Sequence, residues 1–209
     1  MNTSDRTRTA FAEAVTAYLR TVRSVGPDQW DLPAMGEWTV RELVAHASRA
    51  LITTESYLDV PARTIEVATS AGYFAAALDL PGVHADVAER GRAQVAELGP
   101  DPASTLDVLA ERVLARVADT PDDAVLGTFI GGIRFVDYLP SRVVELVVHT
   151  LDLNDALDRA PDLPLTAVVV ALETLAEVAA ARPGVVDPAA LVRALTGRAP
   201  LPGDFNVLG

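Results

Sequence analysis

The segment PSRVVELVVHTLDLND places a carboxylate and an imidazole four residues apart, at Glu145 and His149. On a helix, such a Glu-x3-His pair brings both side chains to one face, and both groups suit a borderline divalent ion such as zinc. At about 100° per residue, Asp152 and Arg142 fall in the same narrow arc, and most of the remaining circumference is apolar. The arc is therefore either the solvent face of an amphipathic helix or a polar strip inside a bundle, satisfied there by a metal ion.

A metal site of this kind needs a third ligand, and the chain has 3 histidines in all to supply it. His46 stands in the apolar setting ELVAHASRA, where a helix pair would bring it opposite His149. A lone histidine among apolar residues is also a common hydrogen-bonded core residue, so both interpretations stay open. His84, beside a proline and a glycine, has no periodic companion and is expected at the surface. Cysteine is absent, which excludes thiolate ligands, disulfides and a catalytic thiol of the protein's own.

Helical periodicity dominates the chain and predicts the elements that must position these residues. The predicted helices span residues 5–25, 39 to 58 or 61, 62–79, 84–98, 104–118, 140–159, 165–181 and 188–195. Thr39-Val-Arg-Glu42 is a capping box that opens the helix carrying His46. Ser104 is expected to cap the 104–118 helix.

Between residues 120 and 138 the pattern changes. Gly127, Gly131 and Gly132 punctuate a β-leaning stretch, which is expected to be a small hairpin or an irregular loop. The helix with Glu145 follows. Asp137 or Tyr138 is expected to precede it, and Pro140 to lie in its first turn, where a missing amide costs nothing.

Composition excludes several classes of partner. The formal net charge of −12 repels phosphate backbones and anionic lipid, so neither nucleic acid nor a membrane surface is an expected partner. The N-terminus lacks the basic-then-apolar build of a secretory signal, and the most apolar stretch is interrupted by Glu173 and Glu177. These features predict a soluble protein of the cytoplasm.

Three segments together resemble the DinB-like metal-dependent thiol transferases: GEWTVRELVAHASRA, PSRVVELVVHTLDLNDAL and LVRALTGRAPLPGDFNVL. The branch they resemble most is that of the actinobacterial proteins related to mycothiol-dependent maleylpyruvate isomerase, and a composition rich in alanine, arginine and valine suits such a source. The resemblance implies an all-α fold, a four-helix bundle of DinB type with short additional C-terminal helices. We expect the bundle to occupy residues 1–160 and a helical extension, 161–209, to pack on it.

The resemblance also implies the site. It assigns His46, Glu145 and His149 as ligands of one divalent metal ion, with zinc the first expectation, although nickel, manganese and iron suit the same donors. The family's aspartate three residues after the second histidine matches Asp152, which would orient that ligand. Arg142 either neutralises an acidic substrate or forms a salt bridge to Glu145, and the salt bridge is the preferred interpretation.

Three protein ligands leave a coordination position open, and a metal can deprotonate a bound thiol at neutral pH. The resemblance therefore implies a mycothiol-like thiol bound as a thiolate, an electrophilic second substrate, and activity as an S-transferase or thiol-assisted isomerase.

The named isomerase carries a further C-terminal domain that residues 161–209 are too few to form, so maleylpyruvate itself is not the expected substrate. Two alternatives stay open: a metal-dependent hydrolase that uses bound water, and a non-enzymatic bundle stabilised by its metal. The protein is expected to be a monomer or a homodimer. Trp30, Trp38 and Tyr138 line a substrate pocket or, as the simpler interpretation, cap and fill the bundle.

Overall fold

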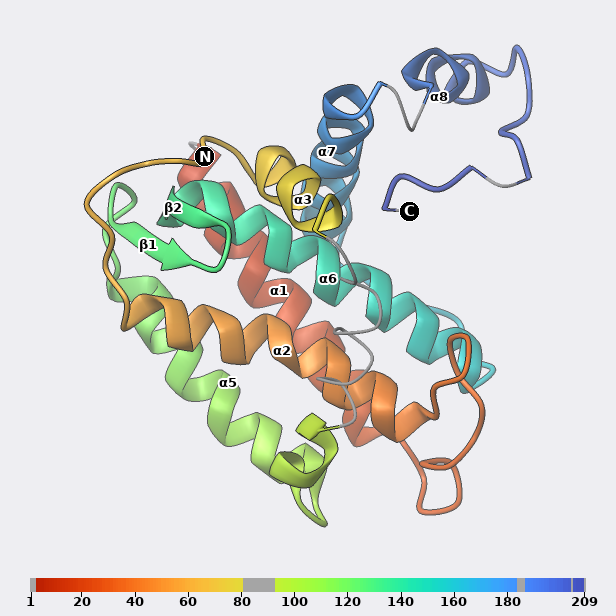
Figure 1. The fold of residues 1–209 in the computed structure, drawn as a ribbon. Coiled ribbons are helices and arrows are strands. Elements are labelled where there is room, and N and C mark those ends of the chain that lie inside the picture. The colour runs from red at the N-terminus through yellow and green to blue at the C-terminus, as the bar shows by residue number, and fades with distance from the viewer. Residues whose placement is uncertain (1–2, 81–92, 184–186, 204, 209) are drawn as a thin grey trace.

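The computed structural model describes residues 3–80, 93–183, 187–203 and 205–208 (Figure 1). Its elements, in chain order, are α1 (Thr3–Arg23), α2 (Val40–Leu58), α3 (Ser70–Leu78), α5 (Pro102–Asp119), β1 (Val125–Thr128), β2 (Gly131–Arg134), α6 (Phe135–Ala156), α7 (Leu165–Ala181) and α8 (Pro188–Leu195). Residues 93–98 are also helical. The predicted all-α class, a four-helix bundle with additional C-terminal helices, is confirmed. His84 and most of the helix predicted over 84–98 lie outside the described residues.

Helices α1, α2, α5 and α6 form the bundle, and each packs against two of the others (Figure 1). Each helix turns an apolar stripe inward, and the core contains fully buried Phe11, Tyr18, Leu43, Leu106 and Leu146. Burying an apolar side chain of this size stabilises the fold by about 1.5–3 kcal/mol. The phenol of Tyr18 is satisfied within this core, because it donates a hydrogen bond of 2.7 Å to the backbone carbonyl of Val44.

Helix α6 is packed on several sides, since α1, α2, α3 and α7 all contact it. Its polar strip therefore lies partly inside the molecule. Helix α7 runs along α1 and α6 and buries Ala167, Val170, Ala171 and Val178 against them, whereas α8 contacts α7 and buries none of its residues (Figure 1). The division of the chain at residue 160 stays a prediction.

The helix that carries His46 begins as predicted. Thr39 is the N-cap of α2, and the capping box is complete: Thr39 Oγ1 accepts from the Glu42 amide at 3.3 Å, and Glu42 Oε2 accepts from the Thr39 amide at 2.9 Å. The predicted cap of the next bundle helix is wrong. Asp101 caps α5 by accepting from the Ser104 amide at 3.2 Å, and Pro102 takes the first helical position.

The stretch rich in glycine is a hairpin in which β1 and β2 pair antiparallel, with Val125 opposite Arg134. The predicted helix over 62–79 is wrong in its first part, because the residues before Ser70 form bends and isolated β-bridges beside this hairpin. The amides of Glu66 and Val67 both donate to the carbonyl of Gly132, at 2.9 and 3.0 Å. A side chain at Gly132 would not fit, since a Cβ there would lie 1.9 Å from the carbonyl oxygen of Thr64.

Helix α6 starts earlier than predicted. It begins at Phe135 directly after β2, so Pro140 lies inside the helix and not in its first turn. The free amides of this early start find partners in the segment before the hairpin: Phe135 donates to the carbonyl of Ala124 at 2.7 Å, and Val136 to that of Asp122 at 3.3 Å. The hairpin thus sets where α6 begins.

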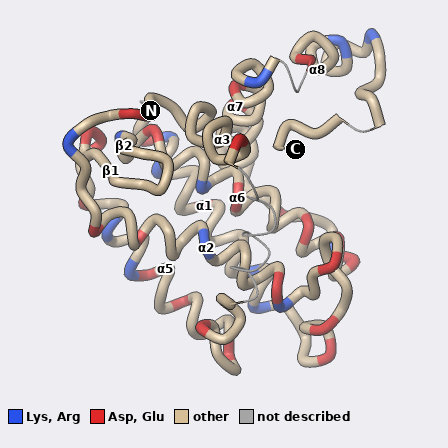
Figure 2. Tube along the Cα trace, viewed as in Figure 1, with Lys and Arg blue, Asp and Glu red and all other residues tan. Residues whose placement is uncertain are grey.

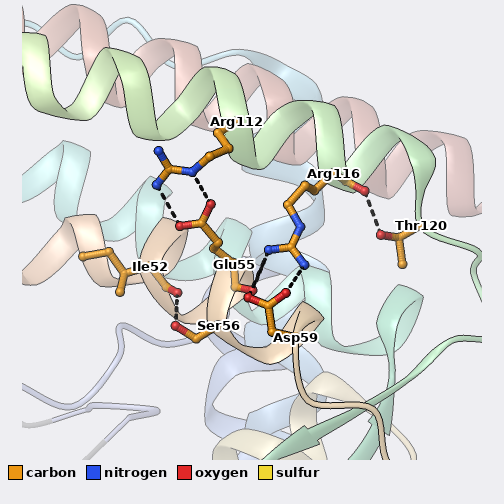
Figure 3. Close-up of polar contacts among 7 residues, drawn as sticks. All are labelled: Ile52, Glu55, Ser56, Asp59, Arg112, Arg116 and Thr120. Carbon is orange, nitrogen blue, oxygen red and sulfur yellow. Dashed lines mark hydrogen bonds and ion pairs between the residues drawn. The ribbon is translucent and has the colours of Figure 1, made fainter.

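Two ion pairs join α5 to α2 on the outside of the bundle (Figure 3). Arg112 donates a hydrogen bond to each carboxylate oxygen of Glu55, and Arg116 Nη2 lies 2.6 Å from Asp59 Oδ1. The hydrogen bond from Arg112 holds the pKa of Glu55 below its usual range. Exposed pairs of this kind typically contribute about 1 kcal/mol or less, so they orient the two helices more than they stabilise them.

Acidic residues occur along α5 and in the loop between α1 and α2 (Figure 2). In the part of the chain that the structure describes, no helix combines the length and the apolar character needed to cross a membrane.

Candidate metal centre

Three side chains from two bundle helices converge. His46 comes from α2, and Glu145 and His149 come from α6; one ligand atom from each lies within 4.8 Å of the other two. Glu145 Oε2 is 3.4 Å from His149 Nε2 and 4.0 Å from His46 Nε2. The structure thus brings together all three residues that the sequence singled out as ligands.

The packing of α2 against α6 creates this cluster. Glu145 and His149 are neighbours because they are one helical turn apart, and His46 enters from the facing helix with its ring 4.7 Å from that of His149, edge to face at 82°. His46 Nδ1 is buried and has no hydrogen-bond partner among the described residues. An imidazole of this kind is held by packing alone.

Asp152 lies where the sequence placed it, beside His149. Its Oδ2 is 3.0 Å from His149 Nδ1. A carboxylate at this distance keeps a proton on Nδ1, so Nε2, which faces Glu145, is the ring nitrogen that would bind a cation once its own proton has left. The same arrangement orients histidine ligands in metal sites.

The electrostatics of the cluster favour a cation. Burial alone would lower the pKa of His149, but hydrogen bonds to Asp152 and Glu145 outweigh it and raise the pKa to about 9. Burial alone would raise the pKa of Glu145, but its hydrogen bond with His149 and the charge of Arg142 lower it to about 2. Burial, and then the charge of His149, lower the pKa of His46 to about 4. At neutral pH a single proton on His149 thus supplies the positive charge between two carboxylates.

The donors suit a divalent cation that would replace this proton. Ligand atoms about 2.0–2.1 Å from a tetrahedral metal lie roughly 3.3 Å from one another. The three ligand atoms lie from 3.4 Å to at most 4.8 Å apart, so to bind one ion each pair would have to close by at most about 1.5 Å. About a quarter of the Glu145 side chain (26%) is exposed, compared with 11% of His46 and 10% of His149, so Glu145 is the least buried of the three residues.

Of the three aromatic residues considered from the sequence, Trp38 lies closest to the cluster. Its ring is 4.6 Å from that of His46 and covers it, because the backbone of the preceding loop folds back on itself: the Ala34 amide donates to the Trp38 carbonyl at 2.8 Å. Trp30 packs under the guanidinium of Arg41 at 5.0 Å, and Tyr138 is fully buried.

The predicted salt bridge between Arg142 and Glu145 is not formed. Within the described residues Arg142 has no acidic partner at 4.0 Å or less; its guanidinium lies over the rings of Tyr138 and Tyr73, at 5.0 and 5.5 Å. Sequence reasoning missed Tyr73, since it belongs to the segment whose start was assigned wrongly.

The fold and the cluster define a class: a DinB-like helical bundle with two histidines and a glutamate between two of its helices. The family model described as mycothiol maleylpyruvate isomerase N-terminal domain matches residues 11–154, which contain all three cluster residues. The chain belongs to this family. No curated protein and no solved structure matches it.

Replacing Asp152 with asparagine is expected to weaken zinc binding about 10- to 100-fold, because His149 loses the carboxylate that fixes its tautomer and raises its basicity. Competition with a chromophoric chelator measures the affinity. Asp155→Asn is the matched control, since Asp155 is exposed on the same helix. Equal affinity in the two variants would mean that Asp152 does not orient a metal ligand.

Proposed function

We propose that this protein is a metal-dependent enzyme that uses a small-molecule thiol, mycothiol or a close analogue, as an S-transferase or thiol-assisted isomerase. The observation that carries the proposal is the convergence of His46, Glu145 and His149 within 4.8 Å in a member of the mycothiol maleylpyruvate isomerase N-terminal domain family. We propose zinc as the cation, because two imidazoles and one carboxylate are a donor set typical of catalytic zinc.

Each residue has a role in this proposal. The two Nε2 atoms and the Glu145 carboxylate would hold the cation, Asp152 would orient His149, and Trp38 would keep His46 in place. A divalent cation lowers the pKa of a coordinated thiol into the neutral range. The chain has 0 cysteines, so this thiol has to come from solution. The exposed part of Glu145 marks the side from which the thiol would approach.

We propose further that residues 1–160 form the functional bundle and that 161–209 are an extension that covers one side of it. Helix α7 packs along α1 and α6, near the start of α6 and away from α5 (Figure 1). The cytoplasm remains our proposed location.

A conjugation assay tests the function. The zinc-loaded protein is expected to accelerate conjugation of 1-chloro-2,4-dinitrobenzene only when mycothiol is present, because the nucleophile is the added thiol. Removing zinc with a chelator or replacing Glu145 with alanine should abolish the acceleration, whereas Asp155→Asn should retain it. Turnover of an ester without thiol would indicate a hydrolase, and a rate independent of zinc would contradict the proposal.

A further inference from the structure

Arg142 is a buried cation beside the candidate metal centre. It is 8% exposed and lies one helical turn before Glu145 on α6, in the same polar strip. Electrostatic interactions connect it with both Glu145 and His46. Its side chain is therefore part of the same site and not of the outer surface.

In the described parts of the chain, Arg142 interacts with the charge of Glu145 but has no carboxylate within ion-pair distance. Its one hydrogen bond there is from Nε to Ser141 Oγ, at 3.0 Å. No described carboxylate comes within 4.0 Å of it, and its two terminal nitrogens find no acceptor among the described residues. Burying a guanidinium without a counter-ion is costly, and its fork of N–H groups matches the two oxygens of a carboxylate.

The tyrosine rings beside it do not remove this imbalance. Tyr138 and Tyr73 offer their faces to the guanidinium, at 5.0 and 5.5 Å. A ring face attracts a cation but supplies no oxygen lone pair to the N–H groups. The rings therefore hold the guanidinium in place while its terminal N–H groups stay available to a ligand.

We propose that Arg142 binds a carboxylate of the electrophilic second substrate and so selects acidic electrophiles. This inference rests on the proposed function. Three residues along a helix rise about 4.5 Å, so the bound carboxylate would lie roughly one turn from the cation. A substrate whose carboxylate is a few bonds from its electrophilic carbon would then present that carbon to the thiol.

The test uses the cobalt-loaded protein, because a thiolate bound to Co²⁺ gives a charge-transfer absorption that reports binding without turnover. Mercaptoacetate, 3-mercaptopropionate and 4-mercaptobutyrate each carry a thiol and a carboxylate at increasing separation, and 2-mercaptoethanol is the neutral thiol for comparison. At least one of the acids is expected to bind about tenfold or more tightly than 2-mercaptoethanol, as a charge-assisted pair to arginine allows. Arg142→Gln should abolish this advantage and leave the affinity for 2-mercaptoethanol unchanged; Arg142→Lys should retain part of it.

Arg49→Gln is the matched control, since Arg49 is a second arginine that acts electrostatically on His46, from α2. If Arg49→Gln loses the affinity advantage of the acids as fully as Arg142→Gln does, the proposal is overturned, because the acids would then be attracted by nearby positive charge in general and not by a specific site. An advantage of the acids that persists in Arg142→Gln would also overturn the proposal, as the carboxylate would then chelate cobalt.

If all four thiols bind the wild-type protein equally, Arg142 binds no carboxylate while the proposed thiol chemistry stands. If none of them changes the cobalt spectrum, the proposed function fails, and this proposal with it. Should Arg142→Gln not fold, the proposal is tested by comparing the wild-type protein with Arg142→Lys, in which the advantage of the acids over 2-mercaptoethanol should be smaller.

Discussion

Replacing His149 with alanine is expected to weaken the binding of zinc at least about a hundredfold, because one of three protein donors is lost. The same change should destabilise the zinc-free protein by about 1–3 kcal/mol, since Glu145 loses the ion pair with His149 that offsets its burial. Isothermal titration and chemical unfolding measure the two quantities. The loss of stability comes from the contact between His149 Nε2 and Glu145 Oε2, which are 3.4 Å apart, and the loss of zinc affinity comes from the same nitrogen.

Asp155→Asn, on the exposed side of the same helix, should change neither quantity. A His149→Ala variant that binds zinc as tightly as the wild-type protein would show that the ion sits elsewhere. Loss of stability without loss of zinc binding would assign His149 a structural role alone.

Zinc affinity should rise steeply with pH. The pKa of His149 is raised to about 9, so at lower pH the incoming cation has to displace a proton from it. One displaced proton changes the apparent dissociation constant about tenfold per pH unit, or roughly a thousandfold between pH 6 and 9. His46, with a pKa lowered to about 4, is neutral throughout this range and adds no slope. Chelator competition at several pH values measures this dependence.

The zinc-free protein should show the opposite trend. Because the pKa of His149 lies above its ordinary value of 6.5, its contribution to stability is complete below pH 6.5 and is lost as the pH rises through about 9. Unfolding free energies at pH 6.5 and 9.5 test the sign. A zinc affinity that does not change between pH 6 and 9 would contradict the protonated state of His149 deduced from its contacts with Asp152 and Glu145.

Features encoded in short stretches of sequence could be predicted. The capping box at Thr39 needs only four residues, and the structure contains it as expected. The Glu145–His149 pair follows from helical spacing alone. The approach of His46 to that pair depends on how α2 packs against α6, which no local sequence pattern predicts. The prediction that His46 joins the pair therefore rests on the resemblance to DinB-like proteins.

Features that depend on distant backbone groups could not be predicted. Residues 62–69 belong to the predicted 62–79 helix, yet hydrogen bonds to the hairpin around Gly132 hold them outside any helix. The start of α6 at Phe135 relies on the carbonyls of Ala124 and Asp122, so Pro140 lies inside the helix and not in its first turn. The spacing of Arg142 and Glu145 predicts a salt bridge, whereas in the structure the guanidinium lies over the ring of Tyr73, from α3, and over that of Tyr138, one turn earlier on α6.

Zinc-edge X-ray absorption on the zinc-loaded protein, before and after mycothiol is added, tests the central claim most directly. We expect a first shell of light atoms with the outer scattering of two imidazoles, and one added sulfur at about 2.3 Å once the thiol is present. A spectrum without imidazole scattering, or a closed first shell that takes up no sulfur, would contradict the account.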